Sequence, residues 1–192
     1  MDAHLHSRFS RATSKQLTIE NLSKYGKIKG LNIIATGDFT HPIWFKELKE
    51  KLKPASQGLY TYENTHFILS TEVSTIYEQD GLTRKIHHIL YAPDFETVEE
   101  INKTLSKYGS LSIDGRPMFK GLTSPELVEK LMGISNEIVV IPAHAWTPWF
   151  SVFGSKSGFD SMKECYQDME KHIFALETGL SSDPKMNWRL SS

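Results

Sequence analysis

The sequence is poor in cysteine, in long apolar runs and in net charge, and each shortage excludes a class of protein. It has a single cysteine, Cys165, among 192 residues, which excludes an internal disulfide framework and a zinc cluster built from cysteines alone. No apolar run approaches the length of a transmembrane helix, so we expect a cytoplasmic protein without a membrane partner. The net charge is −1 and gives no overall basic field, so a nucleic-acid-binding module without catalysis is the least favoured hypothesis.

The composition is that of a globular domain, in which short apolar runs alternate with amphipathic stretches. Hydrophobic residues make up 39% and charged residues 23% of the chain, as is ordinary for such domains. Five apolar runs are expected to be strands, covered on both faces: residues 31–36, 66–75, 85–92, 137–143 and 172–178. The alternation of strands and helices predicts an α/β fold with a parallel sheet, either open or closed into a barrel.

Helix signals lie between the expected strands. Residues 18–29 precede Gly30, a residue type that commonly follows the end of a helix. The capping-box pattern, in which Ser or Thr is followed three residues later by Glu, occurs at 97–100, 123–126 and 161–164. We therefore expect a helix to begin at each of these three places.

Histidines and carboxylates recur near the ends of the expected strands. His4 and His6, in the stretch DAHLHS, would share one face of an extended segment. Further candidates end other strands or follow them: Asp38, His41, Glu72, His87, His88 and His144. A lone aspartate after a strand is most often a turn or capping residue, and only one of His87 and His88 can face inward on a regular strand. Together, however, five segments would bring ligand atoms to one edge of the sheet.

A metal site explains this gathering better than capping or core packing does. Glu72 lies in an apolar, β-rich run, where a carboxylate needs a partner or a cation. Imidazole and carboxylate without thiolate suit zinc, manganese or iron, and paired ions of this kind serve phosphate ester hydrolysis. His66 and His172 begin their runs, and we interpret them as structural.

The stretch 144–159 is unusually aromatic, with Trp146, Trp149, Phe150, Phe153 and Phe159. Either these rings fold back into the core, or the stretch is a lid or a base-stacking surface beside the site.

These motifs resemble the PHP family (polymerase and histidinol phosphatase). The likeness rests on the motifs DAHLHS, TGDFTHP, TEVST, HHILY and PAHAW. Three longer segments have sequences similar to those of the endonuclease Q subfamily: HSRFSRATS, PAHAWTPWFSVFGSKSGFDS and ALETGLSSDPKMNWRLS. The likeness extends over essentially the whole chain, so residues 1–192 are expected to be one metal-dependent phosphoesterase domain. The resemblance implies a distorted (β/α)7 barrel that holds two or three divalent ions at the strand ends. Zinc is the first expectation, with manganese, iron or magnesium as alternatives.

The resemblance also assigns roles to individual residues. It implies these metal ligands: His4, His6, Asp38, His41, Glu72, His88 and His144. Asp38 and His41 are alternatives for one role, because the family's Asp-His sequence reads Asp38-Phe39 here. His88 is preferred to His87 because HILY follows it, and Glu72 matches a glutamate that bridges two ions. Glu72 and Asp38 are the expected catalytic residues.

The reaction implied by the resemblance is hydrolysis of a phosphodiester in DNA beside a deaminated base such as uracil or hypoxanthine. Arg8, Arg11 and Lys15 follow the first ligands and either bind a phosphate or form a solvated loop. Glu177 either orients a metal ligand or caps a turn.

The chain departs from the family pattern at its end. The family's last motif, Asp-Ala-His, would follow NWRLS, but the sequence stops at Ser192, which predicts a barrel that is incomplete at its C-terminus. Either this chain binds metal with reduced affinity and has weak or no turnover, or a separate chain supplies the missing region. Two further hypotheses stay open at this point: a phosphomonoesterase of the same family, and a non-catalytic remnant of the barrel.

Overall fold

The structure is a computed structural model that describes residues 1–179 and 184–188. Part of the stretch 175–191 that carries the family resemblance therefore lies outside the described residues. The helices are α1 (Ile19–Ile28), α2 (Pro42–Lys51), α3 (Phe95–Leu105), α4 (Ser124–Met132), α5 (Met162–Tyr166), the 3-10 helix η1 (Gln167–His172) and α6 (Pro184–Asn187). The strands are β1 (Ile33–Ala35), β2 (Lys53–Ser56), β3 (Leu59–Tyr62), β4 (Thr65–Gln79), β5 (Leu82–Ala92), β6 (Met118–Lys120) and β7 (Val139–Pro142).

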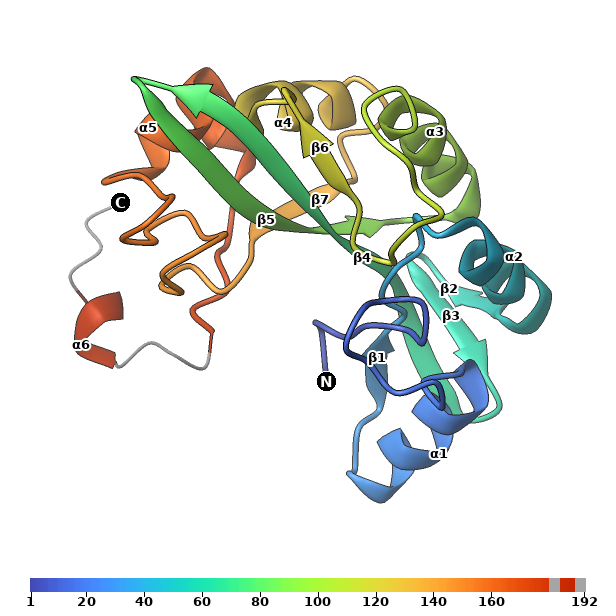
Figure 1. Cartoon of the computed structure of the whole chain (residues 1–192). Coiled ribbons are helices and arrows are strands. Elements are labelled where there is room, and N and C mark those ends of the chain that lie inside the picture. Colours follow the sequence, from blue (N-terminus) through green and yellow to red (C-terminus); the bar gives the residue numbers. More distant parts are fainter. Residues whose placement is uncertain (180–183, 189–192) are drawn as a thin grey trace.

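The long strand β4 joins the two halves of one mixed sheet (Figure 1). Its first half pairs with β3 in the antiparallel and with β1 in the parallel sense. Its second half pairs with β6 in the parallel sense, while β5 runs antiparallel to it from Leu69 onward and in turn pairs with β7. Between the short partners β1 and β6, one edge of β4 faces only loops, and Glu72 lies in this middle section.

The α/β class is confirmed, but the expected parallel sheet is wrong, because most strand pairs are antiparallel. The physical reason is the short connection between the two longest strands. Asp80 and Gly81 alone join β4 to β5, and both have positive φ, at 55° and 73°. Such a two-residue turn makes a hairpin and leaves no room for a crossover helix.

The described residues form an open sheet, so the (β/α)7 barrel is not seen in this part of the chain. The expected strand over residues 172–178 is also wrong, because η1 ends there and an extended segment follows it. Glu177 alone makes a strand-like exchange in that segment: its N–H donates to the Pro142 carbonyl at 2.9 Å and its carbonyl accepts from Ala145 N–H at 2.7 Å. This pairing is too short to form a strand.

Local signals predicted the helix ends well in most cases. Thr18 caps α1, and Gly30, with φ +70°, follows its end. Thr123 and Glu126 form the expected capping box at the start of α4, and Ser161 caps α5. The pattern at 97–100 is not a capping box, because Asp94, three residues before Thr97, caps α3 and accepts from Thr97 N–H at 2.7 Å.

Helices α2, α3 and α4 follow one side of the sheet, and the N-terminal segment and the loop after β7 lie on the other side (Figure 1). The core between helices and sheet contains large buried side chains, among them Trp44, whose indole N–H donates to the Gly37 carbonyl at 2.8 Å. None of the helices in residues 1–179 and 184–188 has the length and apolar character needed to cross a membrane. The packing of the helical side holds the middle of β4 in place.

Candidate metal centre

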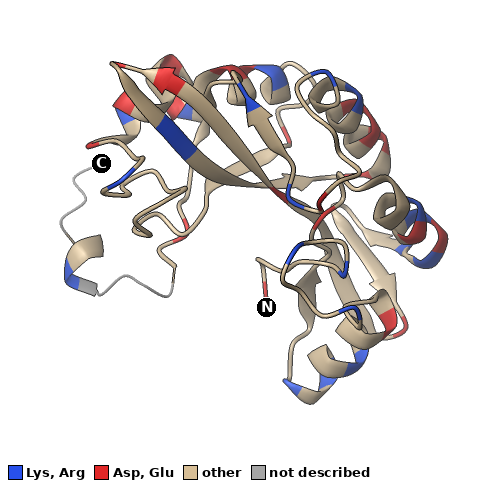
Figure 2. Ribbon diagram, in the orientation of Figure 1, with Lys and Arg blue, Asp and Glu red and all other residues tan. Residues whose placement is uncertain are grey.

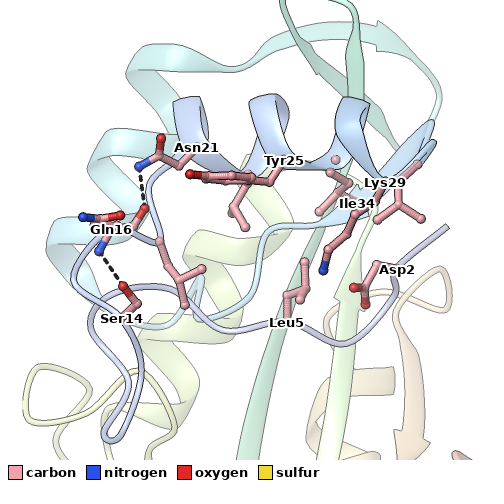
Figure 3. Close-up of a pocket in the computed structure, with 12 residues that line it drawn as sticks. Asp2, Leu5, Ser14, Gln16, Asn21, Tyr25, Lys29 and Ile34 are labelled. Carbon is pink, nitrogen blue, oxygen red and sulfur yellow. Dashed lines mark hydrogen bonds between the residues drawn. The ribbon is translucent and has the colours of Figure 1, made fainter.

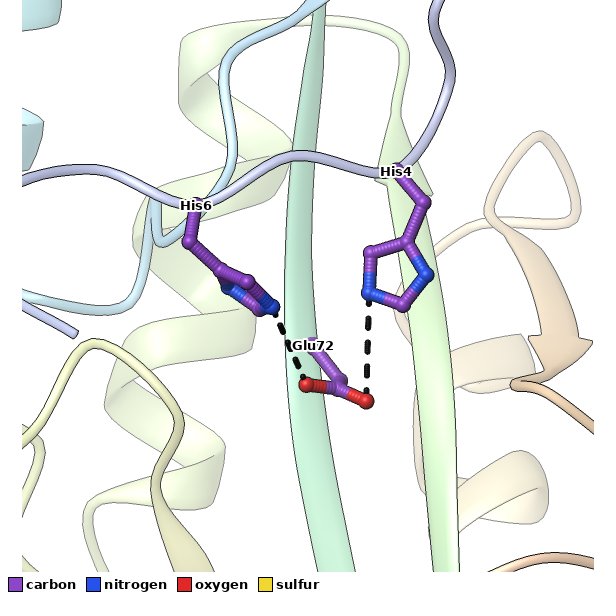
Figure 4. Close-up of side chains that lie close together, drawn as sticks. All are labelled: His4, His6 and Glu72. Carbon is purple, nitrogen blue, oxygen red and sulfur yellow. Dashed lines mark ion pairs between the residues drawn. The ribbon is translucent and has the colours of Figure 1, made fainter. Parts of the chain in front are cut away.

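Glu72 is a carboxylate in the middle of β4 with only 2% of its surface exposed. Four imidazoles surround it. Their nitrogens lie at these distances from its oxygens: His87 Nδ1 at 2.8 Å, His144 Nε2 at 3.2 Å, His6 Nε2 at 3.4 Å and His4 Nε2 at 3.8 Å. Figure 4 shows His4 and His6 approaching Glu72 from the N-terminal segment. We call these five side chains the metal cluster.

Three different parts of the fold deliver the imidazoles to Glu72. Asp2 forms a bridge to Ile34 that ties the N-terminal segment to β1, and side-chain alternation then turns His4 and His6 to the same side. His87 lies on β5 opposite Ser74, which is two residues from Glu72 and therefore on its face of the sheet. His144 lies two residues after the end of β7, so the cluster draws its members from segments far apart in sequence.

The imidazoles are oriented by polar groups behind them. Asp38 contacts His6 Nδ1 at 3.0 Å, and both Glu177 carboxylate oxygens lie 3.0 Å from His4 Nδ1. Thr147 Oγ1 lies 3.0 Å from the Nδ1 atom of His144. Each of these contacts leaves the Nε2 atom directed toward Glu72. A carboxylate behind an imidazole that fixes its tautomer and orientation is typical of metal-binding histidines.

The carboxylates and imidazoles of the site shift each other's pKa values. Burial opposes a charge on His4, but the carboxylates of Glu177 and Glu72 outweigh it and raise the pKa of His4 to about 10. Burial also opposes the charge of Glu72, yet its contacts with His144, His4 and His87 hold the pKa of Glu72 well below its usual range. Burial lowers the pKa of His87, so this imidazole is poised to be neutral. The site therefore keeps an ionised carboxylate facing nitrogen donors.

The donor atoms fit divalent cations. They fall into two groups that share Glu72, one with His4 and His6 and one with His87 and His144, and within each group the ligand atoms lie within 4.8 Å of one another. His4 Nε2 is buried without a hydrogen-bond partner in the described residues, and His87 Nδ1 and His144 Nε2 converge at 3.2 Å. Imidazole nitrogen with bridging carboxylate oxygen is the donor set of zinc, manganese and iron sites.

The structure places the two members of the His87–His88 pair on opposite faces of the sheet, with His87 and not the expected His88 on the face of Glu72. His88 pairs with Val73, so its side chain lies on the opposite face of the sheet from Glu72. There it is fully buried, its Nδ1 is 3.0 Å from Tyr166 Oη and its Nε2 is 3.1 Å from Thr75 Oγ1. Burial lowers the pKa of His88 to about 3. Strand register, which the sequence did not reveal, decides that His87 takes the place expected for His88.

Asp38 and His41, the alternatives for one ligand role, lie in different surroundings. Besides His6, the Asp38 carboxylate accepts from Ser7 N–H and Oγ, each at 2.7 Å, and from Ser10 Oγ at 2.8 Å. It therefore contacts the cluster through His6. His41 is the residue before α2, and its ring stacks on Phe9 with centroids 4.2 Å apart. It belongs to neither group of converging ligand atoms.

The three side chains expected to bind a phosphate differ in their pairing with carboxylates. Arg8 is paired with Glu47, and Arg11 with Asp114 at 3.3 Å, whereas Lys15 is exposed. Sequence reasoning missed Arg116, whose positive charge contributes, after burial, to the lowered pKa of His87. Its guanidinium donates to the Arg11 carbonyl at 3.2 Å and has no carboxylate partner among the described residues. Arg116 follows no ligand in sequence, so no local signal pointed to it.

The aromatic stretch after β7 divides between the two expected roles. Phe159 is buried in the core, and Trp146 packs on Phe153 with centroids 4.9 Å apart. Phe150 instead packs against His87, with ring centroids 4.6 Å apart, and Trp149 is half exposed. One part of this loop therefore completes the core and another part borders the metal cluster.

A cavity of about 390 Å³ lies on the other side of the N-terminal segment (Figure 3). Its lining is mostly apolar and includes Leu5, which alternates with His4 and His6 and so points away from Glu72. It contains no member of the metal cluster. This cavity is therefore separate from the metal cluster.

Comparison with known proteins relates the chain to endonuclease Q. The chain is 36% identical over 149 residues to an uncharacterised protein of Methanocaldococcus jannaschii. The aligned region makes up 77% of this chain and 16% of that protein. The lesion-specific endonuclease PfuEndoQ of Pyrococcus furiosus has a TM-score of 0.83 and 35% identity over 97% of this chain. An endonuclease Q bound to a 27-mer duplex substrate with an abasic lesion at the active site has a TM-score of 0.83 and 36% sequence identity, and the match covers 96% of this chain. No family model matches the chain.

The chain spans 43% of the length of each of these endonuclease Q structures. A protein of Bifidobacterium adolescentis, proposed to be a metal-dependent phosphoesterase, has a TM-score of 0.58 at 16% identity and covers 98% of this chain and 80% of that protein. At that identity the likeness concerns the fold alone. The chain thus has the fold of part of endonuclease Q.

Proposed function

We propose that this chain is a metal-dependent phosphoesterase that cleaves DNA, nicking one strand beside a deaminated base. The observation that carries the proposal is the convergence of four imidazoles on the buried Glu72, with Asp38 and Glu177 placed behind two of them. The likeness to endonuclease Q supports DNA as the substrate, because that enzyme has been seen with a duplex at its active site.

The residues of the chain divide the work between them. His4, His6, His87 and His144 would hold divalent cations, with Glu72 shared between two of them. Cations bound there would activate water as a nucleophile and offset charge on the phosphate oxygens. With a cation bound, Asp38 and Glu177 would each accept a hydrogen bond from the Nδ1 atom of an imidazole and so direct its Nε2 atom to the cation. Arg116 contributes positive charge near His87, and in this proposal its guanidinium binds the phosphate held at the cluster.

The test is a cleavage assay with the purified chain and added Zn²⁺ or Mn²⁺. The substrates are a duplex with one uracil or hypoxanthine, the same duplex with normal bases, and a soluble aryl phosphate monoester. We expect cation-dependent nicking of the modified duplex to exceed cleavage of the other two. Cleavage of the monoester alone, or no cation-dependent cleavage of DNA, would contradict the proposal.

A matched pair of variants on β4 ties the activity to the cluster. Glu72→Gln should abolish nicking, because it removes the shared carboxylate. Glu78→Gln changes a glutamate on the same strand whose carboxylate binds Thr83 instead, at 2.6 Å, and should leave nicking unchanged. Equal activity of the two variants would contradict a role for Glu72.

A further inference from the structure

A cationic and aromatic surface borders the metal cluster on the side of β5 and the loop after β7. Lys85 lies two residues before His87 on β5, and its ammonium group lies 5.1 Å from the ring centre of Trp149 and 5.7 Å from that of Phe150. Phe150 in turn contacts His87 at 4.6 Å between ring centroids. Figure 2 shows basic residues on this part of β5. We call Lys85, Trp149 and Phe150 the base-contact surface.

We infer that the base-contact surface binds an unstacked nucleobase together with its phosphate, so that the cluster acts on single-stranded or locally opened nucleic acid. The inference rests on the proposed function for the location of the reacting phosphate. Trp149 leaves 51% of its surface exposed, so this side chain is accessible to a ligand. Aromatic rings stack on bases of any sequence, and a base inside a duplex does not offer its face.

The backbone fixes this surface in place. Phe150 has φ +59°, a left-handed conformation that is strained for an aromatic residue. Its N–H donates to Ser157 Oγ at 3.1 Å, and its carbonyl accepts from His87 N–H at 3.0 Å. Gly154 and Gly158 pack so closely that an added Cβ at either would overlap neighbouring backbone atoms. The loop thus holds a strained residue with its ring against a cluster member.

The charges suit an anionic ligand. No carboxylate pairs with Lys85 among residues 1–179 and 184–188. Its ammonium group contacts the rings of Trp149 and Phe150 and is available to an anionic ligand. Alternation along β5 places Lys85 on the same face of the sheet as His87. A phosphate next to a base stacked on Trp149 would lie between this ammonium group and the cluster. This arrangement combines the two contacts that single-strand-binding proteins use, a cation for the backbone and a ring for the base.

Helix α1 offers a matched control. Lys24 lies 5.6 Å from the ring centre of Tyr25, and Tyr25 is 50% exposed. This pair has the same kind of contact as Lys85 and Trp149, and Tyr25 is as exposed as Trp149, but neither residue belongs to the metal cluster or contacts it among the described residues. Any general effect of removing a surface cation and ring should therefore also appear in Lys24→Ala and Tyr25→Ala.

The experiment measures the affinity of the full chain for two fluorescent oligomers by anisotropy. One is a short oligothymidylate and the other is an abasic oligomer with the same number of phosphates; each is checked for intactness after the titration. Trp149→Ala should weaken binding of the oligothymidylate about fivefold or more and leave the abasic oligomer unaffected. Lys85→Ala should weaken both and lower the slope of log affinity against log salt by about 0.7.

Two results would overturn the inference. One is that Trp149→Ala binds the oligothymidylate as tightly as the unmodified chain, or weakens both oligomers equally. The other is that the Lys24 and Tyr25 variants lose as much affinity as the Lys85 and Trp149 variants. Trp149→Phe should retain most of the affinity, which separates stacking from misfolding. Because the readout is affinity and not cleavage, failure of this inference is distinguishable from failure of the proposed phosphoesterase activity.

Discussion

Glu72 lies where an ionised carboxylate is costly unless its charge is offset. Its exposed fraction is 2%, and the groups that face it are imidazoles. Two of the imidazoles have a second carboxylate behind them, from Asp38 and Glu177. Three carboxylates and four imidazoles gathered at a partly buried site are stabilised by cations far better than by an apolar surrounding. The chemistry of single residues therefore argues for bound metal.

The exchange of His87 for His88 leads to a first prediction. His87→Ala should lower cation affinity by about 10- to 100-fold or more. Loss of a residue that only orients a metal ligand already costs about 10- to 100-fold, and His87 is itself an expected ligand. His88→Ala should leave cation binding intact and destabilise the fold by about 3 kcal/mol, because it removes a buried, hydrogen-bonded ring. Competition with a chromophoric chelator and urea unfolding measure the two effects. If His88→Ala lost cation binding while His87→Ala kept it, the assignment from register would be wrong.

Burial of His88 predicts a pH dependence of stability. Its pKa is about 3 in the folded chain and about 6.5 when unfolded. Below pH 6.5 the unfolded chain therefore binds a proton that the folded chain does not bind, and folding weakens as the pH falls toward 3. The cost is about 1.4 kcal/mol per pH unit. Urea unfolding of chelator-treated protein should show this slope, and His88→Gln should flatten it; an equal slope in both proteins would contradict the prediction.

At the residue scale, residue type and position along the chain were sufficient to predict which side chains come together. His4, His6, Glu72 and His144 were proposed as ligands from sequence, and the structure brings them together. Residue type and position were insufficient where tertiary contacts decide. The choice of His87 depends on strand register, and the closeness of Arg116 to the cluster depends on how the segment before β6 folds.

At the element scale, the strands were predicted better than their pairing. Four of the five expected strands are present, but a hairpin between β4 and β5 replaces the crossover that was expected there. The Asp80-Gly81 pair between two apolar runs is a recognised hairpin signal and could have been read from the sequence. The short strand β2 could not, because all four of its residues are exposed and no apolar alternation marks it. The alternation of apolar and polar residues marks a strand only where one face is buried, and an exposed edge strand lacks that alternation.

The segment between α3 and β6 positions the carboxylate behind His6. An added Cβ at Gly115 would overlap Asp38 Oδ2 and Ser10 Oγ. Gly115→Ala should therefore displace Asp38, lowering cation affinity about tenfold or more and stability by about 1–3 kcal/mol. Chelator competition and urea unfolding are the measurements.

The control for this substitution is Gly133→Ala at the end of α4. There an added Cβ would meet nothing closer than 3.4 Å, and φ is −68°. This variant should keep both its cation affinity and its stability to within about 0.5 kcal/mol. Unchanged cation affinity in Gly115→Ala would show that Asp38 does not orient His6.

At the scale of the whole molecule, the metal cluster brings together side chains from segments that are far apart in the sequence. The N-terminal segment contributes His4 and His6, and the segment after β7 contributes His144. Cations bound to the folded chain alone should stabilise it by about 2.7 kcal/mol at a hundred times their dissociation constant. Thermal unfolding with Zn²⁺ and with a chelator should differ accordingly, and Glu72→Gln should remove the difference. Identical midpoints in the unmodified chain would mean that the cluster holds no cation.

The central claim is that five side chains from distant segments hold divalent cations. Anomalous diffraction from crystals grown with Zn²⁺, collected on both sides of the zinc absorption edge, tests it most directly. We expect anomalous density at Glu72, within about 2.0–2.3 Å of its oxygens and of nitrogens from the His4–His6 or the His87–His144 pair. Crystals at saturating Zn²⁺ with no such density at Glu72 would contradict the claim.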